Sequence, residues 1–237
     1  MPGGPTADER LVRFARIVAH GMRNPLAVAT GMLDLLDRQV GDQLDDELRD
    51  LLQRSSGAIR RAGDQLLQLQ RYTAAARDEL VVEDVDVAES LAGALEELDP
   101  GGATLVVERL PVIRADHRAV ERALRELLDN ALRHAGDDGR PPTISVCAVD
   151  EDDAWAVAVT DDGPGIPADR RDEAMAEGER LGRTGDGFGL GLPTARILLA
   201  RHGGEVRLED APGGRGLRAV LRWPKEPDLL GEQRPQR

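Results

Sequence analysis

The chain has 237 residues, 41% of them hydrophobic and 32% charged, with a formal net charge of −13. This length and balance allow two modest globular domains and exclude a chain that is disordered throughout. Residues 1–78 sum to zero charge, so residues 79–237 carry the negative charge, which argues against nucleic acid as a partner. No run approaches the roughly 20 apolar residues that cross a bilayer, and the polar start lacks the layout of a secretion signal. We therefore expect a cytoplasmic protein with no membrane insertion.

Two long amphipathic helices are predicted at the N-terminal end. Apolar residues recur three or four positions apart from Leu11 to Leu36 and again from Leu44 to Leu69, with a break at Gly41. Each stripe is a single seam, which one hairpin would leave partly exposed to water and two hairpins would enclose as a four-helix bundle. The pattern therefore predicts a homodimer.

The residues after Tyr72 alternate between strand and helix patterns. Helices are expected at 88–98, 118–135 and 190–201, and strands within 79–87, 104–110, 143–149, 154–160, 205–210 and 217–223. The elements follow no regular βαβ repeat, which predicts an α+β fold whose second domain is an α/β sandwich, with one mixed sheet covered by helices. The chain thus divides into a helical hairpin at 6–78, the α/β-sandwich domain at 79–223 and a tail at 224–237 that is predicted to be disordered.

Three segments of the second domain carry candidate nucleotide chemistry. In ELLDNALRHA, Glu126 and Asn130 are four residues apart and share one helix face. An amide oxygen suits a phosphate-bound magnesium ion, which prefers hard oxygen ligands. In VTDDGPGIP, the strand-end carboxylate of Asp161 can accept a hydrogen bond from an adenine amine, and Gly163 and Gly165 let the backbone approach the base.

The third segment, GDGFGLGL, places glycines at alternate positions just before a helix, at Gly187, Gly189 and Gly191, with Leu190 between the last two. Bare backbone N–H groups and the positive end of the helix can then bind a triphosphate without a lysine. Each segment is weak alone, but their order and spacing predict an ATP site.

Together the three segments resemble the ATP domain shared by sensor histidine kinases, DNA gyrase, Hsp90 and MutL, over residues 85–222. By that resemblance Asn130 is the magnesium ligand, Asp161 is the adenine ligand, and the cofactors are ATP and Mg²⁺. Arg133 stands where a basic residue often helps to bind the phosphates, and Glu126 matches the position that activates water in the ATPase members. The stretch 168–186 resembles the mobile lid over the nucleotide.

The first helix carries a histidine box. In IVAHGMRNPLAV, His20 precedes the pair Asn24 and Pro25, and a proline inside a long helix costs about 3 kcal/mol that a purely structural helix has little reason to carry. The box resembles the phosphoacceptor site of sensor histidine kinases. That resemblance implies autophosphorylation of His20, transfer to an aspartate of a response regulator receiver domain, and a role for Asn24 in placing water for dephosphorylation of the regulator.

One position departs from that box, because the residue after the phosphoacceptor, usually acidic, is Gly21. Glycine supplies neither a base nor an acceptor that could orient the imidazole. Three hypotheses stay open: an ATP-dependent protein-histidine kinase, an ATP-binding scaffold or response-regulator phosphatase with weak autokinase activity, and a pure ATPase relative. No sensory module precedes His20 in this sequence, so we expect the signal to come from a separate sensor protein or from another part of a longer chain.

Overall fold

The computed structural model describes residues 7–135, 140–178 and 189–225. These residues form two compact units. The first holds residues 7–74 together with Gly189 and Leu190, and the second holds the other described residues from Ala75 onward. Gly187 of the predicted phosphate loop, residues 179–186 of the predicted lid and residues 226–237 of the predicted tail lie outside the described residues.

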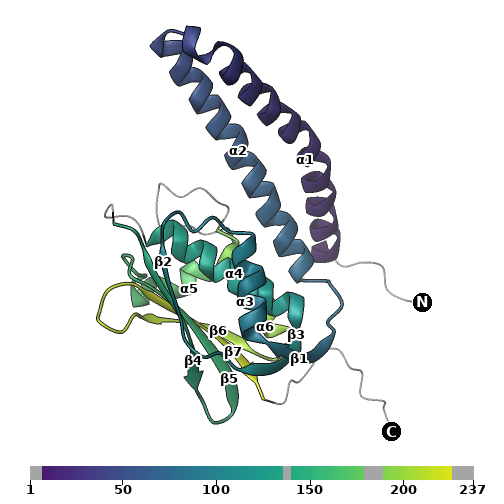
Figure 1. Ribbon diagram of the computed structural model, residues 1–237. Coiled ribbons are helices and arrows are strands. Elements are labelled where there is room, and N and C mark those ends of the chain that lie inside the picture. The colour runs from purple at the N-terminus through teal and green to yellow at the C-terminus, as the bar shows by residue number, and fades with distance from the viewer. Residues whose placement is uncertain (1–6, 136–139, 179–188, 226–237) are drawn as a thin grey trace, which may run out of the picture. The chain divides into compact units, whose positions relative to one another are not determined.

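The first unit contains the predicted hairpin of two long helices. α1 spans Ala7–Val40, the 3-10 turn η1 spans Gly41–Gln43, and α2 spans Asp46–Ala75 (Figure 1). α1 extends beyond its apolar stripe at both ends and α2 extends beyond its stripe at its C-terminal end, because the flanking arginine and glutamine residues are good helix formers. Leu44, the first residue of the second stripe, lies before α2. α1 also continues through Pro25. In the described ranges, no helix is both long and apolar enough to cross a membrane.

The turn of the hairpin is closed by polar contacts that the sequence places beside it. The Oδ1 atom of Asp45 accepts a hydrogen bond from the backbone N–H of Leu48 at 2.8 Å, which caps the first turn of α2. The guanidinium of Arg49 donates to the carbonyl oxygens of Gly41 and Leu44 at 3.0 and 3.2 Å. The connection is therefore a defined reversal rather than a loose linker.

The second unit contains two sheets. β1 (Val82–Asp86) pairs antiparallel with β3 (Val112–Asp116), and a five-stranded sheet has the order β2-β4-β5-β7-β6. The strands of the larger sheet are β2 Thr104–Val107, β4 Thr143–Asp150, β5 Ala154–Asp161, β6 Glu205–Asp210 and β7 Leu217–Pro224. β2 runs parallel to β4, and the remaining neighbours are antiparallel.

The five-stranded sheet is the mixed sheet that the sequence predicts, whereas the separate two-stranded sheet of β1 and β3 was not expected. The strand β3 was not predicted, because it is only five residues long and directly follows Pro111, which ends the preceding extended run. Its register places Ile113 opposite Val85, and both side chains are buried. The small sheet is thus a short ribbon that buries its own pair of apolar residues against the helices.

Three helices cover one face of the larger sheet (Figure 1). They are α3 (Val87–Glu96), α4 (His117–His134) and α6 (Gly191–Ala200), and a short turn η2 (Ala168–Arg170) followed by α5 (Arg171–Ala174) lies after β5. Leu124, Leu127 and Leu128 of α4 pack in one core with Val157 of β5 and Leu221 of β7. The apolar periodicity of α4 therefore determines which of its faces stays available for chemistry.

Buried polar contacts join the end of α6 to the start of α4. His202 is fully buried, its Nδ1 lies 2.7 Å from the carbonyl oxygen of Leu198, and its Nε2 accepts the backbone N–H of Asp116 at 3.1 Å. Burial lowers the pKa of His202, so the ring stays neutral in the fold. The carboxylate of Asp116 in turn caps α4 by accepting the backbone N–H of Ala119 at 2.8 Å.

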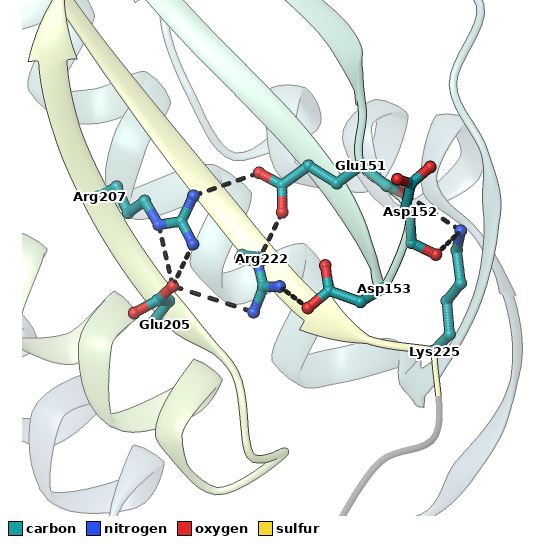
Figure 2. Close-up of polar contacts among 7 residues, drawn as sticks. All are labelled: Glu151, Asp152, Asp153, Glu205, Arg207, Arg222 and Lys225. Atoms are coloured by element: carbon teal, nitrogen blue, oxygen red, sulfur yellow. Dashed lines mark hydrogen bonds and ion pairs between the residues drawn. The ribbon is translucent and has the colours of Figure 1, made fainter.

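The end of the sheet at the β4–β5 turn carries a network of alternating charges (Figure 2). Arg222 of β7 lies 2.6 Å from both Glu151 and Asp153, and Arg207 of β6 lies 2.6 Å from Glu205 and 3.3 Å from Glu151. The network ties the turn to both strands of the closing hairpin. It lies at the opposite end of β5 from Asp161.

Candidate functional site

Helix α4 presents the first group of predicted site residues. Its buried face includes Leu127, Leu128 and Ala131, and this packing leaves Asn130 half-buried at the edge of the core. Arg133 is exposed, and its Nε donates to Asp129 at 2.9 Å one turn earlier. Asn130 and Arg133 therefore lie in the last two turns of α4, and neither side chain is fully buried, so both can contact a bound ligand.

Asp161, at the last position of β5, is a buried carboxylate with 7% of its surface exposed. Its Oδ1 accepts backbone N–H groups from Gly163 at 2.9 Å and from Leu217 at 3.3 Å. Burial raises the pKa of Asp161 above its ordinary value, and these two hydrogen bonds oppose the rise. A charged carboxylate is costly to bury, so its presence at the end of a strand makes Asp161 a candidate for binding a ligand.

The backbone around Asp161 is too close-packed to accept side chains. A Cβ atom at Gly163 would lie 2.9 Å from the carbonyl oxygen of His134, and one at Gly165, whose φ is +73°, would lie 2.7 Å from the carbonyl oxygen of Gly216. The glycines are therefore needed here for close approach of three backbone segments.

Gly216 is a site residue that the sequence analysis missed. Its φ is +105°, and a Cβ atom there would lie 1.8 Å from the carbonyl oxygen of Asp161. The segment GGRGL, just before β7, contains three glycines and was the available signal. It was overlooked because the contact that requires Gly216 comes from a strand far away in the sequence.

Gly191, the last glycine of the predicted loop, lies beside Glu126 of α4. Gly191 is the first residue of α6, and a Cβ atom there would lie 3.4 Å from Oε2 of Glu126. Gly189 and Leu190 directly precede α6. Gly189 has a φ of +67°, and Leu190 is largely buried. The unpaired N–H groups of a helix start favour negative charge, so this position suits phosphate oxygens.

A buried ion-pair chain surrounds Glu126. The Nη2 atom of Arg125 lies 3.3 Å from Oε1 of Glu126, and the Nη1 atom lies 2.7 Å from Oε2 of Glu97, which caps the end of α3. The side chains of Arg125 and Glu126 are 8% and 3% exposed. Arg125 was also missed, because in a chain whose basic residues are nearly all arginines it carries no distinguishing signal.

The histidine box lies within α1, in the first unit. His20 has helical backbone, and its side chain lies outside the described part of the structure. Asn24 and Pro25 are exposed. Gly21 is also exposed, and a Cβ atom there would meet no described atom within 4 Å. The absence of an acidic side chain after His20 therefore has no steric cause in the described surroundings.

The arrangement of donors bears on the expected metal. Among the described residues, no group of three or more His, Cys, Asp or Glu side chains could hold a metal ion. A lone amide oxygen on α4 fits magnesium that is carried mainly by phosphate oxygens and water, and does not fit an ion held by an all-protein cage. The residues present are therefore compatible with Mg²⁺ brought by a nucleotide.

Two family models match the chain in the order that the fold suggests. The His Kinase A (phospho-acceptor) domain matches residues 10–75, and the histidine kinase-, DNA gyrase B- and HSP90-like ATPase matches residues 115–227. The signal transduction histidine-protein kinase AfsQ2 of Streptomyces coelicolor is 30% identical over 91% of this chain and 42% of its own length.

Solved structures show the same fold. The mycobacterial sensor histidine kinase MprB, 27% identical, covers 62% of this chain and 99% of its own with a TM-score of 0.53. Full-length ShkA in complex with AMPPNP, 24% identical, covers 92% of this chain and 46% of its own with a TM-score of 0.63. The chain thus joins a phosphoacceptor hairpin to an ATP-binding domain of the gyrase and HSP90 type. It belongs to the sensor histidine kinases of two-component systems.

The chain spans between 17% and 55% of the length of the curated relatives that it matches. Its similarity to them therefore concerns the phosphoacceptor and ATP-binding domains.

Proposed function

We propose that this chain is an ATP-dependent protein-histidine kinase that phosphorylates His20 and passes the phosphoryl group to an aspartate of a response regulator receiver domain. The observation that carries the proposal is the buried carboxylate of Asp161 at the end of β5, which accepts backbone N–H groups from Gly163 and Leu217. The matches to a phosphoacceptor hairpin and to a histidine kinase-like ATPase support it.

Binding of ATP is assigned to the residues of the second domain and the loop before α6. Asp161 would accept a hydrogen bond from the adenine amine, and Gly163 and Gly165 would let the ring approach the backbone. Arg133 and the loop residues Gly187, Gly189, Leu190 and Gly191 would bind the phosphates. Asn130 would hold Mg²⁺, which supplies positive charge to the phosphate oxygens when it is bound.

The reaction itself is phosphoryl transfer to a ring nitrogen. A neutral imidazole nitrogen of His20 attacks the γ-phosphorus, the bond to the bridging oxygen of ADP breaks, and ADP leaves with the electron pair. Because Gly21 offers no base, the proton of the imidazole must pass to another acceptor. Asn24 would orient a water molecule for dephosphorylation of the regulator, and Glu126 would polarise water near the γ-phosphate.

A homodimer is part of this proposal. Large apolar side chains of the hairpin face solvent, among them Ile17, Met32, Leu35 and Leu51, which are 53 to 67% exposed. A second copy of the hairpin would bury them in a four-helix bundle. The signal would then reach the dimer from a separate sensor protein or from another part of a longer chain.

The decisive experiment is incubation of the protein with γ-labelled ATP and Mg²⁺. We expect a label that is stable in alkali and labile in acid, and that is lost in His20→Gln. A matched control is His117→Gln, which removes a half-exposed histidine from the start of α4 and should keep the label. A label that persists without His20, or one that is stable in acid, would refute the kinase mechanism.

Two further variants test individual assignments. Asn130→Asp should abolish labelling while the dimer stays folded, and undiminished labelling would show that Asn130 is not the magnesium ligand. Gly21→Glu should label faster at saturating ATP, because the added carboxylate can take the imidazole proton and meets no described atom at its Cβ. If Gly21→Glu is no faster and the wild type labels only weakly, the scaffold or phosphatase function gains support.

A further inference from the structure

Glu126 does not stand alone beside the nucleotide-binding elements. One oxygen, Oε1, is held by Nη2 of Arg125 at 3.3 Å, and the other, Oε2, lies 3.4 Å from where a Cβ atom of Gly191 would be. The carboxylate is thus enclosed between a guanidinium and the first residue of α6. Its orientation depends on which of the two oxygens the guanidinium engages.

Arg125 is itself held from the other side. Its Nη1 atom lies 2.7 Å from Oε2 of Glu97, whose side chain is 51% exposed, whereas the side chain of Arg125 is only 8% exposed. The Nε atom of Arg125 is buried and has no hydrogen-bond partner in the described part of the chain. A buried guanidinium with one nitrogen unsatisfied is costly, and that cost suits a role beyond packing.

The chain of contacts crosses three elements. Glu97 follows the last residue of α3, Arg125 and Glu126 belong to α4, and Gly191 begins α6. A guanidinium is planar and presents its donors in a rigid fork, so it can bind two carboxylates in fixed directions at once. Lysine has a single nitrogen on a flexible stem and would not hold both in the same way.

We infer that Arg125 is a positioning residue that holds the Glu126 carboxylate with Oε2 toward the start of α6, while Glu97 fixes Arg125 from the opposite side. This inference rests on the proposed function, because it gives Glu126 a role at the γ-phosphate. Without Arg125, the buried carboxylate loses the guanidinium that holds Oε1, so its position relative to the start of α6, where phosphate oxygens would bind, is no longer fixed. Arg125 thereby fixes the negative charge of Glu126 relative to the phosphates.

The test is a double-mutant cycle on the rate of His20 labelling at saturating ATP. Arg125→Met should lower that rate about tenfold or more, since misplacement of a catalytic group by about 1 Å can cost about a hundredfold. The same substitution in a Glu126→Gln background should change the rate by less than about twofold, because the group that Arg125 positions is gone. Arg125→Lys should give an intermediate rate, because it keeps the charge and loses the fork.

A matched control lies on the same helix. Arg122 forms an ion pair of the same 2.7 Å length, with Asp78, and touches neither Glu97 nor Glu126 in the contacts that the structure shows. Arg122→Gln should be labelled on His20 at the same rate as the wild type. Thermal unfolding and Mg²⁺-ATP binding of every variant separate a lost fold from a lost orientation. Glu97 is half-exposed, so Glu97→Gln should fold and should slow labelling less than Arg125→Met.

The outcomes distinguish the inference from the proposed function. If the wild type carries no label on His20, the proposed function fails and the inference falls with it. If the wild type is labelled but Arg125→Met costs the same factor with and without Glu126, Arg125 has only a structural role. If Glu126→Gln is too slow to measure, the KM and kcat values of Arg125→Lys and Glu97→Gln decide. A lower kcat at unchanged KM supports positioning, and a higher KM alone overturns it.

Discussion

The helical hairpin and the ATP-binding domain solve the burial of apolar residues in opposite ways. In the second unit Leu124, Leu127 and Leu128 of α4 and the valines of β5 are almost fully buried within one core. In the first unit Met32 and Leu35 are 67% and 55% exposed, and Ala19 and Leu52 are the buried apolar residues among the side chains described between residues 17 and 74. The ATP-binding domain therefore has the core of a self-sufficient fold, whereas the hairpin lacks one until its seam is covered.

The largest predicted effect concerns the ATP-binding domain, which has a core of its own. Gly216→Ala would force a Cβ atom to within 1.8 Å of the carbonyl oxygen of Asp161, at a φ of +105°. We expect a loss of more than about 3 kcal/mol in the free energy of unfolding of the domain, together with loss of ATP binding. Chemical denaturation and isothermal titration with Mg²⁺-ATP measure the two effects.

Gly213 supplies the control for that substitution. Its φ is +107°, and a Cβ atom there would meet no described atom within 4 Å. Gly213→Ala therefore carries the backbone strain without the clash and should cost only about 1–2 kcal/mol. Equal losses in the two variants would show that the approach of Gly216 to Asp161 is not what requires glycine.

The next largest effect concerns the helical hairpin, whose exposed apolar residues we expect a second copy to cover. Met32→Glu places a charge on the exposed seam of α1 and should weaken the dimer at least about a hundredfold, because about 1.4 kcal/mol is a tenfold change and the substitution occurs once in each protomer. The unfolding of the ATP-binding domain should stay as in the wild type. Sedimentation equilibrium measures the dimer, and Arg38→Gln, an exposed change near the end of the same helix, is the control. An unchanged dimer in Met32→Glu would place the interface elsewhere.

A smaller effect is a loss of stability at acidic pH, which should be confined to the ATP-binding domain. Burial lowers the pKa of His202, so below about pH 6.5 the unfolded chain takes up a proton that the folded domain does not. Stability should therefore fall as the pH drops from about 6.5 toward the lower folded value, by at most about 1.4 kcal/mol per pH unit. This loss of stability at low pH should be absent in His202→Gln and present in His117→Gln. Denaturation midpoints at several pH values, with the hairpin and domain transitions followed separately, test this.

The smallest effect belongs to the charge network of Figure 2. Arg222→Gln removes pairs to Glu151 and Asp153, but the side chain of Asp153 is 77% exposed, so water already screens part of the interaction. We expect a loss of about 1 kcal/mol and unchanged ATP affinity. Arg114→Gln, whose pair to Asp84 is exposed and 3.7 Å long, should cost close to nothing. A larger loss for Arg114→Gln would contradict the ranking by burial.

The same contrast explains what the sequence could predict. The hairpin helices and α4 were predicted because their apolar residues repeat at helical spacing, and those predictions are confirmed as elements of the fold. The strand β3 and the separate β1–β3 sheet were not, because a five-residue strand after a proline gives too short a pattern. Short-range patterns determine elements, whereas the pairing of elements depends on contacts that a pattern does not contain.

The candidate site divides along the same line. Asp161, Gly163 and Gly165 were singled out because they are neighbours in one turn; the structure shows a hydrogen bond from Gly163 to Asp161 and a close approach of Gly165 to Gly216. Gly216 and Arg125 act on partners from other elements, Asp161 and Glu97, so nothing adjacent to them in the sequence marks their importance. The roles of His20, Asn24 and Asn130 stay predictions that the variants above test.

The network at the β4–β5 turn also has a practical consequence. Lys225 is the only lysine of the chain, and its Nζ lies 5.1 Å from the centre of the Trp155 ring while it donates to the carbonyl oxygens of Glu151 and Asp152. Besides the α-amine, Lys225 is therefore the one side chain that amine-reactive dyes can label, at the far end of β5 from Asp161, with a native tryptophan beside it as an energy donor. Once the α-amine is blocked, labelling of Lys225 would yield an optical reporter on the ATP-binding domain without any engineered residue.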